Sequence, residues 1–374
     1  LWHSSVVGAY SASASVRSDK DRLDKLHGTI NFTSKGLARN QQAMSELMQE
    51  SLQLARFDEL PRLRELVSQI RTYRESSITG SGHSLAMTAA ASGLSASAYL
   101  TQRWGGMDGL AGIKTLDQSL NATEGLESLA ARLEAIHQLV LQQPCQYLLV
   151  AEGERLAGFT EVMQNSFPHA AAPENSHIIS YNPSLTAVNH CWTTNTQVSF
   201  CAKAYPTVPT GHADSAALTI LGGVLRNGFL HRAVREQGGA YGGGASQDNQ
   251  SGTFRFFSYR DPRIAGTLQD FDDSIDWVVE NSLGYDKIEE AILGVIGSLD
   301  KPGSPAGEAI QAFHSELNGR GKACTIQFRN QVLAVTEADV RRVAAAYLTP
   351  DRAQTAVITN ADLAAGTGLE IISI

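Results

Sequence analysis

The amino-acid sequence predicts an α+β fold made of two similar domains, each a mostly antiparallel sheet with helices packed on one face. The chain has 374 residues, which exceeds the usual size of one hydrophobic core and favours two domains. Both halves show the same order of patterns, with strands first, then grouped helices, then a closing strand. Runs of strands separated from runs of helices are typical of α+β layers rather than of alternating βαβ units.

A composition change near the middle of the chain predicts the domain boundary. Pro168 and Pro173 lie among polar residues there, and no helical or strand period is sustained. We therefore expect a first domain at residues 1–165, a linker at 166–180 and a second domain at 181–374.

In the first half, short alternating patterns between Ala14 and Ala38 predict early strands or a hairpin. Ser34 is placed to cap the following helix, whose apolar residues continue to Leu54. Asp58-Glu-Leu-Pro61 predicts a second helix start, because proline is favoured in a first turn. Gly80-Ser-Gly82 is expected to interrupt that helix.

The rest of the first half predicts two more helices and a strand. An Ala- and Ser-rich stretch from Leu85 to Leu100 is typical of a tightly packed helix, which Trp104-Gly-Gly106 would end. An apolar stripe predicts a helix over Leu126–Leu141, and the apolar run Gln146–Val150 predicts a buried strand.

The second half repeats this order, which we detect from the elements and not from residue identity. Thr336-Glu-Ala-Asp339 resembles a capping box and marks the start of the last long helix. The expected elements are strands over Thr186–Ala202, a helix over about Ala213–Val234, a strand over Gly252–Tyr259, helices over Ile264–Ser282, Lys287–Asp300 and Thr336–Leu348, and a closing strand over Thr355–Thr359.

Composition excludes several classes of function. The net charge is −8 with a pI of about 5.7, so we expect no nucleic-acid partner. Apolar runs stop well short of membrane-spanning length, so we expect no membrane partner either. The four cysteines match no metal or redox spacing and are too sparse for a disulfide scaffold, so we interpret them as reduced and mostly buried.

The segment from Arg235 to Tyr241 is the strongest candidate site. The two residues lie six positions apart across a glycine turn, which can bring both side chains to one mouth. A guanidinium and a phenol donate hydrogen bonds, which suits a peptide carbonyl or a developing oxyanion. The structural alternative is equally weighted: an Arg that closes a helix, where its charge favours the dipole, and a Tyr that begins a strand.

The glycines around Tyr241 have more than one interpretation. A phosphate-binding loop is rejected, because here the order is helix, glycines, strand, and no Lys-Ser/Thr pair follows. Glycines that let a substrate backbone approach are the better account, so we name Gly239, Ala240 and Gly242 as substrate-binding candidates. The nearby Asp261-Pro262 is more simply explained as a turn that opens the next helix than as a binding clamp.

Metal and nucleophile motifs are missing from the sequence. Neither His-x-x-Glu-His nor His-Glu-x-x-His occurs, and no two histidines lie four residues apart. Ser81-Gly82-His83 lacks the Gly-x-Ser-x-Gly elbow of a serine nucleophile. The acidic residues between Asp270 and Asp276 lack calcium-loop spacing and are typical of a solvated helix face. We therefore expect no metal ligands in this chain.

Two segments carry a family resemblance. Val234-Arg-Glu-Gln-Gly-Gly-Ala-Tyr-Gly-Gly243 together with Phe257-Ser-Tyr-Arg-Asp-Pro262 resembles the C-terminal half of the presequence-protease branch of pitrilysin-type (inverzincin) zinc metallopeptidases. Weaker matches span most of the chain; they are Gly80-Ser-Gly-His83, Arg103-Trp-Gly-Gly106 and Ala291-Ile-Leu-Gly-Val-Ile-Gly-Ser-Leu-Asp300.

The resemblance implies a mechanism shared between two halves. In such enzymes the N-terminal half carries His-x-x-Glu-His and a zinc-activated water, and the C-terminal half closes the chamber. Its Arg and Tyr, which correspond to Arg235 and Tyr241, reach the substrate beside the zinc. The implied partners are the N-terminal catalytic half of the same polypeptide and unstructured peptides such as targeting peptides. The zinc would belong to that half, and this chain alone would be inactive.

A second function remains open. The alternative is a non-catalytic structural or partner subunit of a processing-peptidase-like complex. Retention of both Arg235 and Tyr241 favours the peptidase, because a scaffold needs neither donor. The expected location is the cytoplasm if the source is bacterial, with the mitochondrial matrix or plastid stroma as the alternative.

Overall fold

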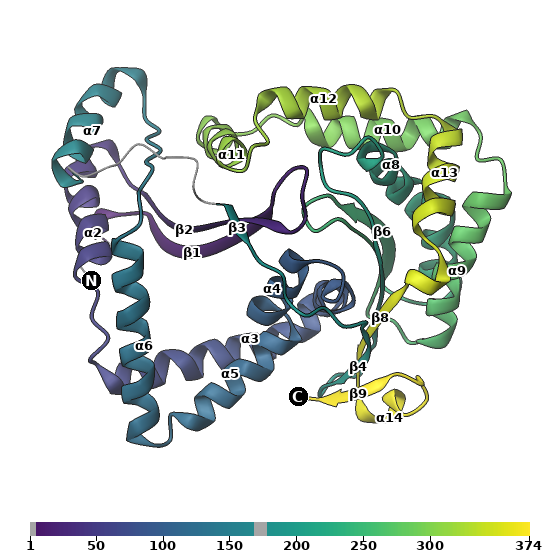
Figure 1. Ribbon diagram of the computed structural model, residues 1–374, viewed down its shortest axis with the longest axis horizontal. Coiled ribbons are helices and arrows are strands. Elements are labelled where there is room, and N and C mark those ends of the chain that lie inside the picture. Colours follow the sequence, from purple (N-terminus) through teal and green to yellow (C-terminus); the bar gives the residue numbers. More distant parts are fainter. Residues whose placement is uncertain (1–4, 168–177) are drawn as a thin grey trace.

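The computed structural model describes residues 5–167 and 178–374, and it contains two β-sheets surrounded by helices (Figure 1). The first sheet has three strands in the order β1-β2-β3, and the second has six in the order β6-β7-β5-β8-β4-β9. The predicted α+β class is confirmed. The two sheets differ in size, and they do not establish the predicted similarity of two domains.

The first sheet is a long hairpin with one short added strand. β1 (Ala9–Ser18) pairs antiparallel with β2 (Lys25–Lys35), and β3 (Ile178–Ser180) pairs antiparallel with the start of β2. The predicted early hairpin is therefore confirmed. The predicted linker at 166–180 lies mostly outside the described residues, although its last three residues form β3. The domain boundary stays a prediction.

The second sheet is mixed but mostly antiparallel. β7, β5 and β8 form its antiparallel centre with β6 at one edge, whereas β4 runs parallel to both β8 and β9 at the other edge. The strand bounds are β4 (Asn189–Thr193), β5 (Phe200–Pro206), β6 (Gly242–Asp248), β7 (Thr253–Tyr259), β8 (Gln354–Thr359) and β9 (Glu370–Ser373).

Helices cover both faces of the second sheet, which corrects the expectation of one face. Alternate side chains of a strand point to opposite faces, so Cys201 joins one apolar cluster while Phe200 and Ala202 join the other. The first cluster contains residues of α8, α9, α10 and α13. The second contains Ala86 and Ala89 from the first half of the chain. The two halves therefore share a hydrophobic core.

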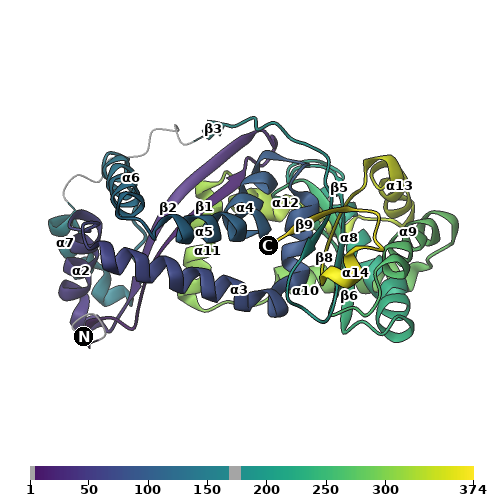
Figure 2. The same cartoon turned by 90° about the horizontal axis from the view of Figure 1, so that it is seen from below.

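The longest helix, α3 (Leu60–Ala91), joins the two parts of the molecule (Figures 1 and 2). Its start follows the prediction, with proline in the first turn. The expected interruption at Gly80-Ser-Gly82 is wrong, because the helix continues unbroken. A Cβ atom at position 82 would overlap the ring of Phe200, so glycine there lets the helix lie close on the sheet.

Three other predictions for the first half are corrected. Ser34 lies in β2, where its hydroxyl donates to the Ala9 carbonyl at 3.2 Å, so it caps no helix. The Ala-rich helix is divided, because Ser95 caps a new helix by accepting from the Ala98 N–H. Residues 146–150 form no strand, and Tyr147, the first apolar side chain of that run, is 36% exposed. By contrast, the predicted helix over 126–141 is confirmed as part of a longer one.

The remaining first-half elements pack beside α3 or cover the hairpin. Figure 1 shows α2, α6 and α7 at the end of the molecule farthest from the second sheet. Their bounds are η1 (Ala38–Asn40), α2 (Gln41–Gln53), α4 (Ala96–Gly105), α5 (Met107–Ser119), α6 (Thr123–Leu141) and α7 (Gly153–Ser166).

The second-half helices mostly follow the prediction. The capping box of α13 is present, with the Thr336 hydroxyl accepting from Asp339 N–H and the Asp339 carboxylate accepting from Thr336 N–H. The bounds are α8 (Ser215–Leu225), η2 (Arg226–Gln237), α9 (Ala265–Glu280), α10 (Tyr285–Leu299), α11 (Pro305–Leu317), α12 (Lys322–Leu333), α13 (Glu337–Tyr347), η3 (Pro350–Arg352) and α14 (Ala361–Ala364).

Two further features of composition have structural counterparts. All four cysteines are free; Cys191 and Cys201 are buried, and Cys145 and Cys324 are half-buried. Of the helices in the described residues, none has the length and apolarity needed to span a membrane.

Candidate functional site

Arg235 lies in the last turn of a π-helix. The sequence predicts one α-helix to about Val234, but the chain changes at Arg226 from α8 to η2, a wider helix with i→i+5 hydrogen bonds. Leu230 and Val234 are buried on its inner face. Arg235 is exposed on the outer side. Such helices are often found at functional sites.

The turn after this helix is a Schellman motif, which explains its first glycines. Ala240 N–H donates to the Val234 carbonyl and Gly239 N–H donates to the Arg235 carbonyl, both at 3.1 Å. Gly239 takes φ +81°, a left-handed conformation that glycine adopts without strain. Ala240 and Val234 both belong to the buried core. This end of the helix therefore fixes where the next residue, Tyr241, emerges.

The other glycines divide into packed and open positions. A Cβ atom at Gly238 would overlap the Arg263 guanidinium, and one at Gly243 would lie 2.7 Å from a Val234 methyl. A Cβ atom at Gly242 would meet nothing within 4 Å. Gly239 and Ala240 thus serve the local fold, and Gly242 is the one of the three substrate-binding candidates that faces open space. Their binding role stays a prediction.

Tyr241 stands exposed at the beginning of edge strand β6. Its side chain is 70% exposed, and its hydroxyl makes no hydrogen bond among the described residues. Its backbone N–H donates to the Tyr259 carbonyl at 3.0 Å and to the Arg260 carbonyl at 3.4 Å. Its ring meets the Tyr259 ring edge-on, with centroids 5.6 Å apart. The phenol is therefore held at its base while its donor end is free.

Arg235 and Tyr241 lie on one turn, but no hydrogen bond within the described residues joins their side chains. The Arg235 guanidinium instead lies 3.4 Å from His231 Nε2, and His231 Nδ1 lies 3.4 Å from a Glu236 carboxylate oxygen. All three side chains are exposed. The local part of the structural alternative is confirmed, since the Arg closes a helix and the Tyr precedes a strand. That placement is compatible with a donor role.

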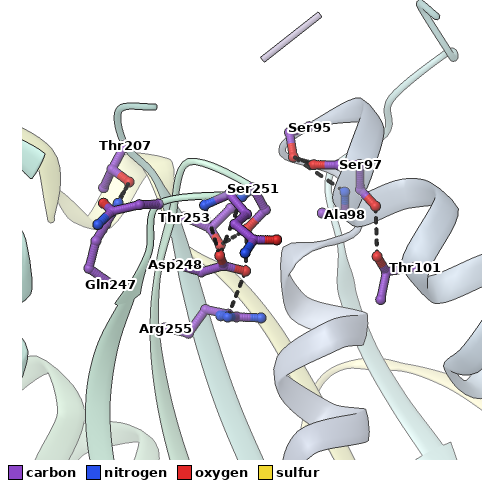
Figure 3. Close-up of polar contacts among 12 residues, drawn as sticks. Ser95, Ser97, Ala98, Thr101, Thr207, Gln247, Asp248, Ser251, Thr253 and Arg255 are labelled. Atoms are coloured by element: carbon purple, nitrogen blue, oxygen red, sulfur yellow. Dashed lines mark hydrogen bonds and ion pairs between the residues drawn. The ribbon is translucent and has the colours of Figure 1, made fainter. Parts of the chain in front are cut away.

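The β6–β7 hairpin is held in register by one carboxylate. Asp248 accepts from the backbone N–H of Gln250 at 2.9 Å, from the Ser251 hydroxyl at 2.8 Å and from the Arg255 guanidinium at 2.8 Å (Figure 3). Gln247 is tied to Thr207 at 2.9 Å beside it. Because β6 pairs with no strand other than β7 among the described residues, its outer backbone edge has no sheet partner.

An aromatic cluster that the sequence interpretation missed supports Tyr259. His83 of α3 lies between Phe257 and Tyr259, with ring centroids 5.6 and 4.8 Å away, and Phe200 lies 5.8 Å from Tyr259. Burial lowers the pKa of His83 below its usual 6.5. The Gly80-Ser-Gly-His83 motif was the available signal, but nothing in it shows which strand the histidine meets.

Asp261 is buried and structural. Its backbone pairs with Ser199 in both directions, at 2.9 and 2.8 Å. Its carboxylate accepts from Arg263 N–H at 2.9 Å and from the Thr267 hydroxyl at 2.7 Å, at the entry to α9. This agrees with the predicted turn that opens the next helix.

The described residues offer no group of three or more His, Cys, Asp or Glu that fits a metal ion. The nearest arrangements are pairs, such as His190 with Glu370 at 3.4 Å. A zinc ion therefore has no fitting site in this part of the protein.

Comparisons with known proteins give the family. A family of domains associated with subfamily C of the M16 peptidases matches residues 2–116, and the family described as "PreP C-terminal domain" matches residues 189–359. The chain is 31% identical over 371 residues to the mitochondrial presequence protease of Danio rerio, covering 91% of this chain and 35% of that protein. It is 33% identical over 277 residues to that of Emericella nidulans, covering 72% and 26%.

Solved structures show the same fold at low identity. Pitrilysin matches with a TM-score of 0.60 and 12% identity over 96% of this chain and 37% of that chain. A protease from Helicobacter pylori matches with a TM-score of 0.61 and 15% identity, over 94% and 82%. The chain spans about a third of the length of the Danio rerio relative. The chain belongs to the presequence-protease family of peptidases, in which it corresponds to the C-terminal region.

Proposed function

We propose that this chain is the C-terminal, chamber-closing half of a zinc-dependent oligopeptidase that degrades unstructured peptides, targeting peptides among them. Membership of the presequence-protease family supports this function, as do the curated relatives that carry that name. The observation that carries it is the free phenol of Tyr241, 70% exposed at the start of an unpaired sheet edge.

Tyr241 would act on the carbonyl oxygen of the peptide bond that is cleaved. When water attacks that carbonyl, negative charge builds on the oxygen, and a fixed donor aimed at it lowers the barrier. The Tyr241 hydroxyl is such a donor. Its backbone and ring contacts with Tyr259 reduce the entropy that is lost on positioning it.

Arg235 would hold the substrate before reaction. Its guanidinium donates hydrogen bonds only, so it suits a peptide carbonyl and competes with no acceptor of its own. The exposed position at the end of η2 leaves its donors available except toward His231. We expect its loss to affect binding more than the chemical step.

No step of this proposal passes through a metal held by the described residues, because they contain no fitting ligand group. The zinc belongs to the proposed catalytic half. The reading frame that precedes Leu1 distinguishes the two functions: it encodes His-x-x-Glu-His for a peptidase and lacks the motif for a non-catalytic subunit. The compartment stays a prediction.

The direct test is Tyr241→Phe in the full-length peptidase. It removes the hydroxyl and keeps the ring contact, so we expect kcat to fall about a hundredfold or more, as for other lost oxyanion donors, with an unchanged Tm. Tyr73→Phe is the matched control, since Tyr73 is a similarly exposed phenol, at 74%, on α3. Near-normal turnover of Tyr241→Phe, measured with a quenched fluorescent peptide, would leave Tyr241 as chamber wall only.

A further inference from the structure

Arg260 has a strained backbone. Its φ is +49°, and it is the one non-glycine residue with positive φ in the part of the chain that the structure describes. This left-handed region is unfavourable for a residue with a Cβ atom, and such strain tends to be kept at functional sites. A glycine at this position would relieve the strain, so the arginine side chain requires its own explanation.

The strain arises from a β-bulge at the end of β7. Ala202 pairs with Phe257, and Ser199 pairs with Asp261, so three steps along one chain segment oppose four along the other. The extra residue lies within Ser258–Arg260, just where Tyr241 N–H reaches two successive carbonyls. Bulges commonly re-aim a side chain beside an active site.

The Arg260 guanidinium is free of hydrogen bonds and ion pairs to the described residues. It is exposed, whereas the neighbouring Arg263 is bound to Asp270 at 2.7 Å. The Arg260 Cζ atom lies 5.3 Å from the centroid of the Tyr259 ring. The ring of Tyr241 contacts that same tyrosine, so Tyr259 is a shared support for a phenol and a guanidinium.

We propose that Arg260 is a third substrate-holding residue, which donates hydrogen bonds to a backbone carbonyl of an extended peptide beside Tyr241. This inference rests on the proposed peptidase function. A guanidinium offers a planar fork of donors, and its contact with the Tyr259 ring limits the orientations of that fork. Carbonyls recur at every residue of an unstructured peptide, so this contact is independent of side-chain sequence.

Two substitutions in the full-length peptidase separate the guanidinium from the backbone strain. Arg260→Gly and Arg260→Ala both remove the donors, so both should raise KM about tenfold with little change in kcat. Arg260→Gly alone relieves the positive φ, so its Tm should exceed that of Arg260→Ala. Arg39→Ala, which removes an exposed arginine in η1, is the control for lost positive charge.

The proposal is overturned if both variants keep a normal KM while Tyr241→Phe loses turnover; in that case the proposed function still stands. Normal turnover by Tyr241→Phe would instead reject the proposed function. The rise in KM should be equal for a peptide rich in glutamate and for its glutamine counterpart. A rise confined to the acidic peptide would mean that Arg260 binds a carboxylate, which contradicts the carbonyl assignment.

Discussion

Tyr241 and Tyr259 are joined twice: the backbone N–H of Tyr241 donates to the carbonyl of Tyr259 at 3.0 Å, and the two rings meet at 84°. The first contact sets where β6 begins, and the second fixes the direction of the phenol. His83 and Phe200 contact the Tyr259 ring as well. The exposed tyrosine is therefore supported by both α3 and the sheet centre.

The two glycines of α3 should respond oppositely to alanine. At Gly82 the new methyl group would overlap the fully buried Phe200 ring, so Gly82→Ala should lower the free energy of unfolding by about 1–3 kcal/mol. At Gly80 nothing lies within 4 Å, so Gly80→Ala should raise it by roughly 0.5–1 kcal/mol through helix propensity. Urea unfolding measures both. Equal effects would contradict the close approach at Phe200.

The two candidate glycines at the site should also differ. Gly239→Ala places a Cβ atom at φ +81° and should cost about 1–2 kcal/mol of stability. Gly242→Ala meets nothing within 4 Å and should leave Tm unchanged. If a substrate backbone lies along the start of β6, Gly242→Ala should raise KM in the full-length peptidase. An unchanged KM would remove Gly242 from the binding site.

His83 should make stability depend on pH on the acid side of neutrality. Burial holds its folded pKa below 6.5, so the unfolded chain takes up the proton first as pH falls. The stability contributed by neutral His83 is complete above pH 6.5 and is lost as pH falls through the lower, folded pKa. His83→Phe keeps an aromatic ring between Phe257 and Tyr259. Its Tm should fall less between about pH 7 and 5, and an identical pH profile would exclude His83 as the cause.

Metal removal should have no effect on this chain by itself. The described residues contain no fitting ligand group, so a chelator should leave the Tm of the purified chain unchanged. We also expect no turnover of a quenched unstructured peptide by the chain alone, with or without added zinc. Chelator-sensitive cleavage by the pure chain would contradict this expectation, provided that a contaminating protease is excluded by a second purification.

The sequence predicts those elements whose residues make their own local signals. The capping box at Thr336 and the helix start at Pro61 are examples, because each depends on neighbours within four residues. The sequence does not predict β6, because three glycines open it and its strand conformation comes from pairing with β7 rather than from propensity. The apolar run at 146–150 has the propensity of a strand but forms none.

The candidate site is only partly visible in the sequence for the same reason. Arg235 and Tyr241 can be named from residue type and spacing, and the turn between them is recognisably glycine-rich. The strained φ of Arg260, the bulge beside it and the contact of His83 with Tyr259 depend on pairing between distant segments. A single sequence carries no direct record of such pairings.

The length of α3 has a mechanical consequence. Its 32 residues span about 48 Å at 1.5 Å per residue, and its C-terminal part rests on the second sheet while its N-terminal part reaches α6. Such a rod acts as a lever. A tilt of about 5° at the sheet would carry the Leu60 end about 4 Å. Because His83 is where the lever touches Tyr259, a change in ring packing at the site has its largest displacement at the opposite end of the molecule.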